Sequence, residues 1–207
     1  MYKTLTPELI LTAYARGIFP MSESRDDDDL FWVDPDQRGV IPLDDFHISR
    51  SLRKTILREP YDIRINSDFS GVVEGCANRE ETWINSEIFS IYMGLHHEGH
   101  AHSVEVWDGS ELVGGVYGVT LQAAYFGESM FSRRRDASKI ALAYLVSRLK
   151  AGGFQLFDTQ FITPHLSSLG AIEIPRSSYH QALQAALKVE ANFHQQPQPV
   201  SGHQVCT

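Results

Sequence analysis

The chain of 207 residues contains few cysteines, no long hydrophobic run and no excess of positive charge. Its two cysteines, Cys76 and Cys206, stand far apart, which indicates neither a disulfide framework nor a zinc knuckle and fits a reducing compartment. No apolar stretch approaches the roughly 20 residues that a membrane-spanning helix needs, and the first residues lack the apolar segment of a signal peptide. We therefore expect a cytoplasmic protein without a membrane partner.

The net charge of −8 argues against non-specific attraction to nucleic acid, but the charges are unevenly distributed. Acid is concentrated at 26–29, where we expect an exposed loop. Base is concentrated at 47–58 and in the run Arg133, Arg134, Arg135. Two basic clusters on an acidic protein could hold a small phosphate-bearing group, although such clusters are usually solvated surface.

Turn residues and periodicity divide the chain into three parts. Residues 1–58 are rich in turns around one short helix, which begins at Thr6-Pro7 and must pack on the rest to be stable. Residues 59–190 alternate strands and helices, with a hairpin turn at Asp108-Gly109, and this order predicts a layered α+β domain. We expect 191–207 to be a disordered tail.

One stretch, residues 112–139, combines several features of a ligand site. A strand-like run interrupted by glycines leads to Glu128, which stands among aromatic and thioether side chains. Glycines in a strand mark a close approach of backbone or ligand, so a ligand that meets backbone, apolar surface and one carboxylate is one hypothesis. A strained core strand with a solvated Glu128 is the other, and spacing alone favours it. The most strongly predicted helix follows at 137–150, with Leu142, Leu145 and Leu149 on one face.

Three further patterns each have a functional and a structural interpretation. Asp158 and Gln160 leave the same face of a strand and could orient an amine, or form a turn that satisfies its own backbone. Trp83 could stack on a nucleobase or belong to the core. His96 and His100 have the separation of a zinc-binding helix, but a glycine interrupts that helix, so we expect no metal.

Taken together, these stretches resemble the leucyl/phenylalanyl-tRNA–protein transferases of bacteria. The similarity lies in YARGIFP (14–20), FHISRS (46–51), TWI (82–84), HAHSVEVW (100–107), LVGG (112–115), GESMFS (127–132), ASK (137–139), DTQ (158–160) and SLGA (168–171). Members of that family move Leu or Phe from aminoacyl-tRNA to the N-terminal Arg or Lys of a protein, which marks the protein for degradation. The resemblance implies a GNAT-like acyltransferase domain with a small N-terminal domain.

The resemblance also implies roles for individual residues. Trp83 would lie by the terminal adenosine of the tRNA and Glu128 by the aminoacyl group. Asp158 and Gln160 match the pair that handles the attacking amine: Gln160 would accept its hydrogen bond, and Asp158 would polarise Gln160 or counter the ammonium. The pocket for the donor side chain would be lined by Val116, Met130, Leu142, Leu145, Leu149 and Phe157. The tRNA would contact Arg133, Arg134 and Arg135. The chemistry requires no cofactor, and we expect a monomer.

Some positions depart from the family pattern and leave details open. Met21 stands where some relatives have a Trp that could stack on the adenosine, which leaves more of that task to Trp83. Leu145 and Thr163 replace an aromatic and a polar amide, so the donor could be Met or another amino acid. Two other functions remain open: an acyltransferase that uses acyl-CoA, for which we find no pyrophosphate cradle, and a non-catalytic adaptor that binds protein N-termini.

Overall fold

The computed structural model describes residues 5–22, 30–79 and 82–206, so the acidic run 26–29 lies outside the described residues. The centre of the fold is a seven-stranded sheet in the order β4-β5-β6-β7-β8-β3-β9, and a two-stranded hairpin, β1-β2, stands beside it. The strands are β1 (Phe19–Ser22), β2 (Leu30–Val33), β3 (Gln37–Val40), β4 (Asp62–Ile65), β5 (Ala101–Asp108), β6 (Glu111–Leu121), β7 (Ala124–Ser132), β8 (Leu156–Gln160) and β9 (Ile172–Pro175).

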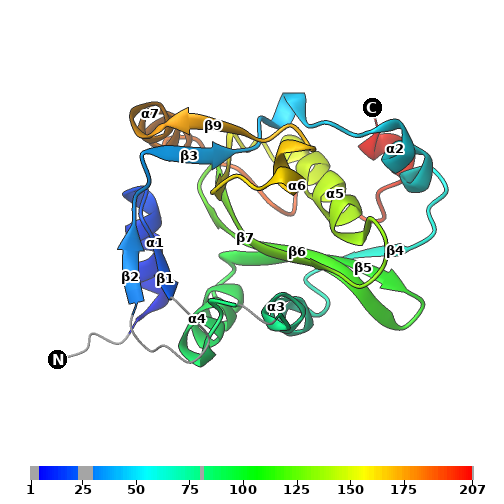
Figure 1. The fold of residues 1–207 in the computed structure, drawn as a ribbon, viewed down its shortest axis with the longest axis horizontal. Helices are drawn as coiled ribbons and strands as arrows, with labels where there is room; N and C mark the ends of the chain where they lie inside the picture. The colour runs from blue at the N-terminus through cyan, green and yellow to red at the C-terminus, as the bar shows by residue number, and fades with distance from the viewer. Residues whose placement is uncertain (1–4, 23–29, 80–81, 207) are drawn as a thin grey trace.

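Helices cover both faces of this sheet, as Figure 1 shows with α3 and α4 below the central strands and α5 above them. The helices are α1 (Pro7–Ala15), α2 (Arg50–Ile56), α3 (Phe69–Ala77), α4 (Ser86–His97), α5 (Ala137–Ala151), α6 (Pro164–Ser167), α7 (Arg176–Ala186) and α8 (Gly202–Val205), with a short 3₁₀ turn η1 (Leu43–Asp45). The predicted α+β layering is confirmed, and each face of the sheet has its own hydrophobic core.

The glycines of β6 let helices approach the central strand closely. A Cβ at Gly114 would lie 2.6 Å from the Cβ of Ala137 in α5, and one at Gly115 would lie 3.0 Å from Val72 in α3. The predicted hairpin is confirmed: β5 and β6 pair in antiparallel fashion around Gly109, which has a φ of 60°. At Gly114 and Gly115 the packing interpretation of the glycine run is therefore the correct one.

The sheet opens between β7 and β8. These two strands are parallel, joined by α5, and their pairing stops at Phe126 and Asp158 although β7 continues to Ser132. Beyond that point the two strand ends are not hydrogen-bonded to each other. A gap at the carboxyl ends of parallel strands is where α/β proteins commonly bind ligands.

The structure differs from the predicted organisation at both ends of the chain. Strand β3 lies in the main sheet between β8 and β9, so residues 37–58 belong to the body and not to a separate unit of 1–58. The expected disorder of 191–207 is wrong for residues 191–206, because Phe193 is 4% exposed and stacks on His102 at 4.1 Å. A few apolar side chains in a mostly polar segment anchor it, and composition alone obscures them.

Candidate active site

A cavity of about 750 Å³ lies where β7 and β8 separate. Its size is typical of sites for small ligands. One wall is apolar and comes from the sheet, α5 and α6: Val116, Met130, Phe131, Leu142, Phe157 and Leu166. Further lining comes from β1, the segment after α3 and the segment before α4: Phe19, Pro20, Met21, Asn78, Arg79 and Trp83. Segments far apart in sequence thus meet around one space.

The cavity brings together most of the residues predicted to bind substrate. Those that line it are Trp83, Val116, Glu128, Met130, Leu142 and Phe157. Leu145 and Leu149 do not, and both are 0% exposed in the core between α5 and the sheet. The three leucines are buried as expected, but a helix rises about 1.5 Å per residue, so Leu145 and Leu149 lie about 4.5 and about 10.5 Å further along the helix axis than Leu142.

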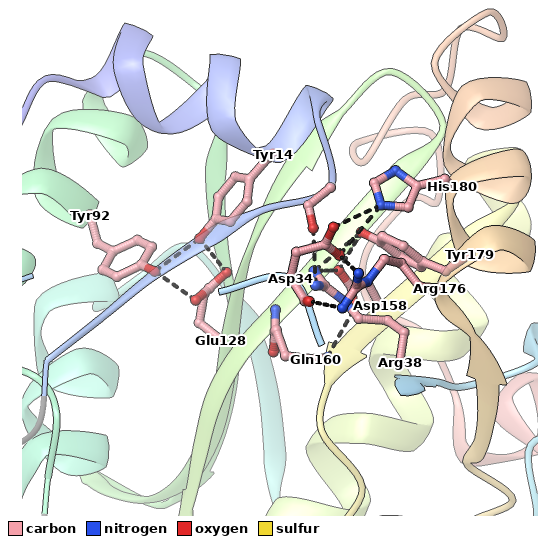
Figure 2. A network of polar contacts seen from close by, with 11 residues as sticks. Tyr14, Asp34, Arg38, Tyr92, Glu128, Asp158, Gln160, Arg176, Tyr179 and His180 are labelled. Carbon is pink, nitrogen blue, oxygen red and sulfur yellow. Dashed lines mark hydrogen bonds and ion pairs between the residues drawn. The ribbon is translucent and has the colours of Figure 1, made fainter. Parts of the chain in front are cut away.

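Glu128 lines the cavity and is held by two tyrosine hydroxyls (Figure 2). Tyr14 donates to its Oε1 at 2.7 Å, Tyr92 donates to its Oε2 at 2.6 Å, and the two hydroxyls lie 3.0 Å apart. Burial raises the pKa of Glu128 to about 7 and the charge of Asp158 adds to the rise, whereas the tyrosine hydrogen bonds and Arg38 oppose it. Near neutral pH this carboxyl group can therefore exist in either protonation state.

Asp158 has a different environment, although Figure 2 shows it close by. Its carboxylate is 0% exposed and forms a two-point ion pair with Arg38, with Nε to Oδ1 at 2.9 Å and Nη2 to Oδ2 at 2.6 Å. Tyr179 also donates to Oδ2, at 2.8 Å. Asp158 does not line the cavity. The expectation that it faces the ligand beside Gln160 is therefore wrong.

Gln160 does line the cavity, at the end of β8. Two carbonyl oxygens flank its amide, so the hydrogen-bonding pattern assigns the NH₂ group to their side, where it donates to Gly127 O at 2.8 Å and Thr159 O at 3.0 Å. The carbonyl Oε1 is then left as an acceptor. Alternation of side chains assumes an extended backbone, but Gln160 has a φ of 58°. For this reason its side chain lines the cavity while that of Asp158 does not.

The three predicted arginines have three different environments. Arg133 lines the cavity, and its guanidinium lies 5.2 Å from the Phe131 ring centroid while it donates to Leu112 O. Arg134 is paired with Glu111 at 2.8 Å on the surface. The Arg135 side chain is 89% exposed. A basic residue that the sequence did not single out, Arg79, also lines the cavity and donates to Met130 O.

Several site residues were missed because no pattern in the sequence gives them a role at the site. Tyr14 begins the stretch 14–20 that resembles the family, but that stretch gives no role to its hydroxyl, and Tyr92 lies outside every such stretch. Arg38 and Tyr179 lie in stretches without a motif. His165 also lines the cavity, and its Nε2 is enclosed without a hydrogen-bond partner among the described residues. The hydrogen bonds of Tyr14, Tyr92, Arg38 and Tyr179 to the two carboxyl groups join segments that are distant in sequence.

Comparisons with known proteins agree with the resemblance seen in the sequence. A family described as leucyl/phenylalanyl-tRNA protein transferase matches residues 40–184, and the N-terminal domain of the same family matches residues 3–36. This division falls close to the start of β3, where the structure also joins the chain to the main sheet.

Individual relatives carry the same description. Proteins named leucyl/phenylalanyl-tRNA–protein transferase are 65% identical in Cereibacter sphaeroides, over 91% of this chain and 88% of the relative, and 65% identical in Ruegeria sp., over 92% and 90%. The protein of that name from Ruegeria pomeroyi is 60% identical over 95% of this chain and 96% of its own length. The solved structure of L-PGS from Bacillus licheniformis aligns with 78% of this chain and 55% of its own, at 15% identity and a TM-score of 0.41.

Proposed function

The chain belongs to the leucyl/phenylalanyl-tRNA–protein transferase family, and we propose that the cavity between β7 and β8 is where it joins leucine or phenylalanine from aminoacyl-tRNA to protein N-termini. The observation that carries this placement is one apolar cavity with a carboxyl group, Glu128, and an amide acceptor, Gln160, at its edge. We extend the proposal to acceptors that begin with Arg or Lys, to their marking for degradation, and to the cytoplasm, where aminoacyl-tRNA is made.

The donor fits this cavity in a definite orientation. Its Leu or Phe side chain would lie against Val116, Met130 and Leu142, where burial of such a side chain contributes about 1.5–3 kcal/mol. Glu128 would meet the aminoacyl group, and Trp83 would stack on the terminal adenosine. Arg133 and Arg79 line the same cavity, so they can meet phosphate oxygens, and Arg134 and Arg135 extend the basic surface toward the tRNA. A GNAT-like arrangement is part of the proposal, supported by the parallel pair β7–β8 that separates beside α5.

The main task of the protein in this reaction is to hold the ester and the amine in the correct orientation. The acceptor amine forms a bond to the ester carbonyl carbon, the ester C–O bond breaks, and one amine proton ends on the released ribose oxygen. The aminoacyl ester is already activated, and good orientation alone can reach effective molarities of roughly 10⁵ M or more. Gln160 would accept a hydrogen bond from the amine through Oε1. Neither a covalent enzyme intermediate nor a cofactor is needed.

Gln160→Ala tests this assignment. With labelled Leu-tRNA or Phe-tRNA and a peptide that begins with Arg, kcat should fall by about 100-fold, because a hydrogen-bond acceptor for the amine is lost. The KM for the donor should stay within about twofold, since the apolar wall is intact. Gln155→Ala is the matched control, an exposed glutamine just before β8, and should retain wild-type activity.

Two results would overturn the proposal. One is full activity of a folded Gln160→Ala protein, and the other is a trapped aminoacyl-enzyme. Labelled Met-tRNA and acyl-CoA belong in the same assay. Transfer from Met-tRNA would widen the donor range, whereas transfer from acyl-CoA in place of aminoacyl-tRNA would favour the acyl-CoA alternative.

A further inference from the structure

The carboxylate of Asp158 has no capacity left for a substrate. Oδ1 accepts from Arg38 Nε at 2.9 Å and from the main-chain N–H of Gln160 at 2.8 Å. Oδ2 accepts from Arg38 Nη2 at 2.6 Å and from Tyr179 at 2.8 Å. Two carboxylate oxygens offer about four lone-pair positions, and four donors occupy them. Asp158 is thus placed to hold its neighbours and not to receive a proton or an ammonium group from the cavity.

Arg38, the main partner of Asp158, is itself tightly held. It is 1% exposed, and its guanidinium carbon lies 4.5 Å from the Phe19 ring centroid and 4.3 Å from that of Tyr179. Nη1 donates to Gly17 O at 3.0 Å. Figure 2 shows Arg38, Asp158 and Tyr179, which come from separate segments of the chain, meeting at the ion pair. A bidentate ion pair enclosed by aromatic faces holds the Asp158 carboxylate of β8 in one position.

The backbone conformation of Gln160 has to be held by its surroundings. Its φ of 58° lies in the left-handed region, which side chains with a Cβ rarely adopt unless the surroundings hold them there. The main-chain hydrogen bond to Asp158 Oδ1 is such a hold, and β3 supports it because Gly39 is the register partner of Gln160. The same backbone conformation puts the side-chain amide against Gly127 O. If Gln160 became extended, its amide would leave that carbonyl.

We propose that Arg38 is a positioning residue for the transfer reaction: through its ion pair with Asp158 it fixes the main chain of Gln160, and so the place of Oε1 in the cavity. The inference rests on the function proposed above for Gln160. In this proposal the charge of Asp158 serves only to pair with Arg38 and takes no part in the reaction itself. Arg38 and Asp158 act through Gln160 and touch neither donor nor acceptor.

Charge-matched variants test this proposal, assayed with phenylalanyl-adenosine and a peptide that begins with Arg. Arg38→Met should lower kcat by about 100-fold while the donor KM stays within about twofold, because the binding wall is untouched. In Arg38→Met/Asp158→Asn the amide oxygen of residue 158 can still accept from Gln160 N–H without an unpaired buried charge. The double variant should therefore recover at least about tenfold of the lost kcat, with the wild-type pH profile. Arg176→Met removes a half-buried arginine of the same region, which pairs with Asp34 and Asp36 and not with Asp158, and should leave kcat within about twofold.

Further outcomes with the double variant and with Arg38→Lys decide between this proposal and its alternatives. If the double variant stays as inactive as Arg38→Met with native stability, or its pH profile changes, the charge of Asp158 takes part in the reaction and the proposal is wrong. Arg38→Lys keeps the charge but loses the two-point geometry, so it should fold and lose about tenfold in kcat. Wild-type kcat in folded Arg38→Lys would also overturn the proposal.

Combining Arg38→Met with Gln160→Ala separates this inference from the proposed function. If Arg38 acts through Gln160, the second substitution should add less than about threefold to the loss caused by the first. Fully additive losses would refute the positioning role and leave the role of Gln160 intact. If Gln160→Ala alone is fully active, the proposed function itself fails.

Discussion

Two carboxyl groups lie near one cavity, one partly buried and one fully buried, and they are supported in opposite ways. Among the described residues, two tyrosine hydroxyls donate to Glu128, which lines the cavity and has a pKa raised to about 7 by burial. Asp158 is paired with a guanidinium and lies outside the cavity lining. Neutral donors leave a carboxyl group able to gain or lose a proton when a ligand arrives. A bidentate cation holds such a group in one place. The first arrangement suits a ligand contact and the second a structural support.

A third carboxylate, with neither kind of support, gives the largest expected effect. Met130→Asp puts a charge into the apolar wall, without the pair of tyrosine hydroxyls that holds Glu128 or the two-point guanidinium that holds Asp158. Arg79 lies nearby but already donates to the main-chain oxygen of residue 130. We expect kcat/KM for Leu-tRNA and Phe-tRNA to fall by at least about 100-fold, because the donor side chain would face a desolvated charge. Met130→Leu, which keeps the volume, should lose little. Comparable activity in the two variants would remove Met130 from the donor pocket.

Stability should separate the two natural carboxyl groups. Arg38→Met leaves the Asp158 carboxylate buried without its cation and should lower the free energy of unfolding by about 3–5 kcal/mol at pH 7. Glu128→Gln keeps the shape of a group whose neutral form is already accessible, so its loss should be about 1 kcal/mol. Denaturant unfolding of both variants measures the difference. Equal losses would mean that the two supports do not differ as described.

The pH dependence of stability should come from Glu128 in a defined window. Its pKa rises from 4.5 to about 7 on folding, so between these values the folded protein binds more protons than the unfolded chain. Stability contributed by this group therefore falls as pH rises from about 4.5 to about 7, and then stays constant. The difference in unfolding free energy between the wild type and Glu128→Gln, measured across pH 4 to 8, isolates this contribution. A difference that is flat across the window would contradict the raised pKa.

The smallest expected effect concerns the tyrosines. Their hydrogen bonds stabilise the ionised form of Glu128, so Tyr92→Phe or Tyr14→Phe should raise its pKa further, by about one unit or less. Tyr179→Phe removes a hydroxyl that serves Asp158 and should leave the Glu128 pKa unchanged. Titration of Glu128 by NMR would compare the three variants. An equal shift in all three would show that the two carboxyl groups are one coupled network.

Local patterns predicted the elements on which the site is built. The hairpin of β5 and β6 follows from a two-residue turn between alternating strands, and α5 follows from its apolar stripe, because both signals lie within a few residues. The stripe identified three buried leucines of a helix that is buried on most sides, but not that Leu142 meets the cavity while Leu145 meets the core. That distinction depends on where β7 and β8 separate, which is set by the whole sheet.

By itself the sequence determined the α+β class, the secondary-structure elements closest to the site, and the family, since each is encoded in short runs of adjacent residues. The tertiary structure alone decided how the two carboxyl groups are supported. Arg38 and Asp158 are 120 positions apart, and Tyr14 and Glu128 are 114 apart. No periodicity or motif spans such separations, because pairing across them exists only when the sheet has brought β3, β7 and β8 together.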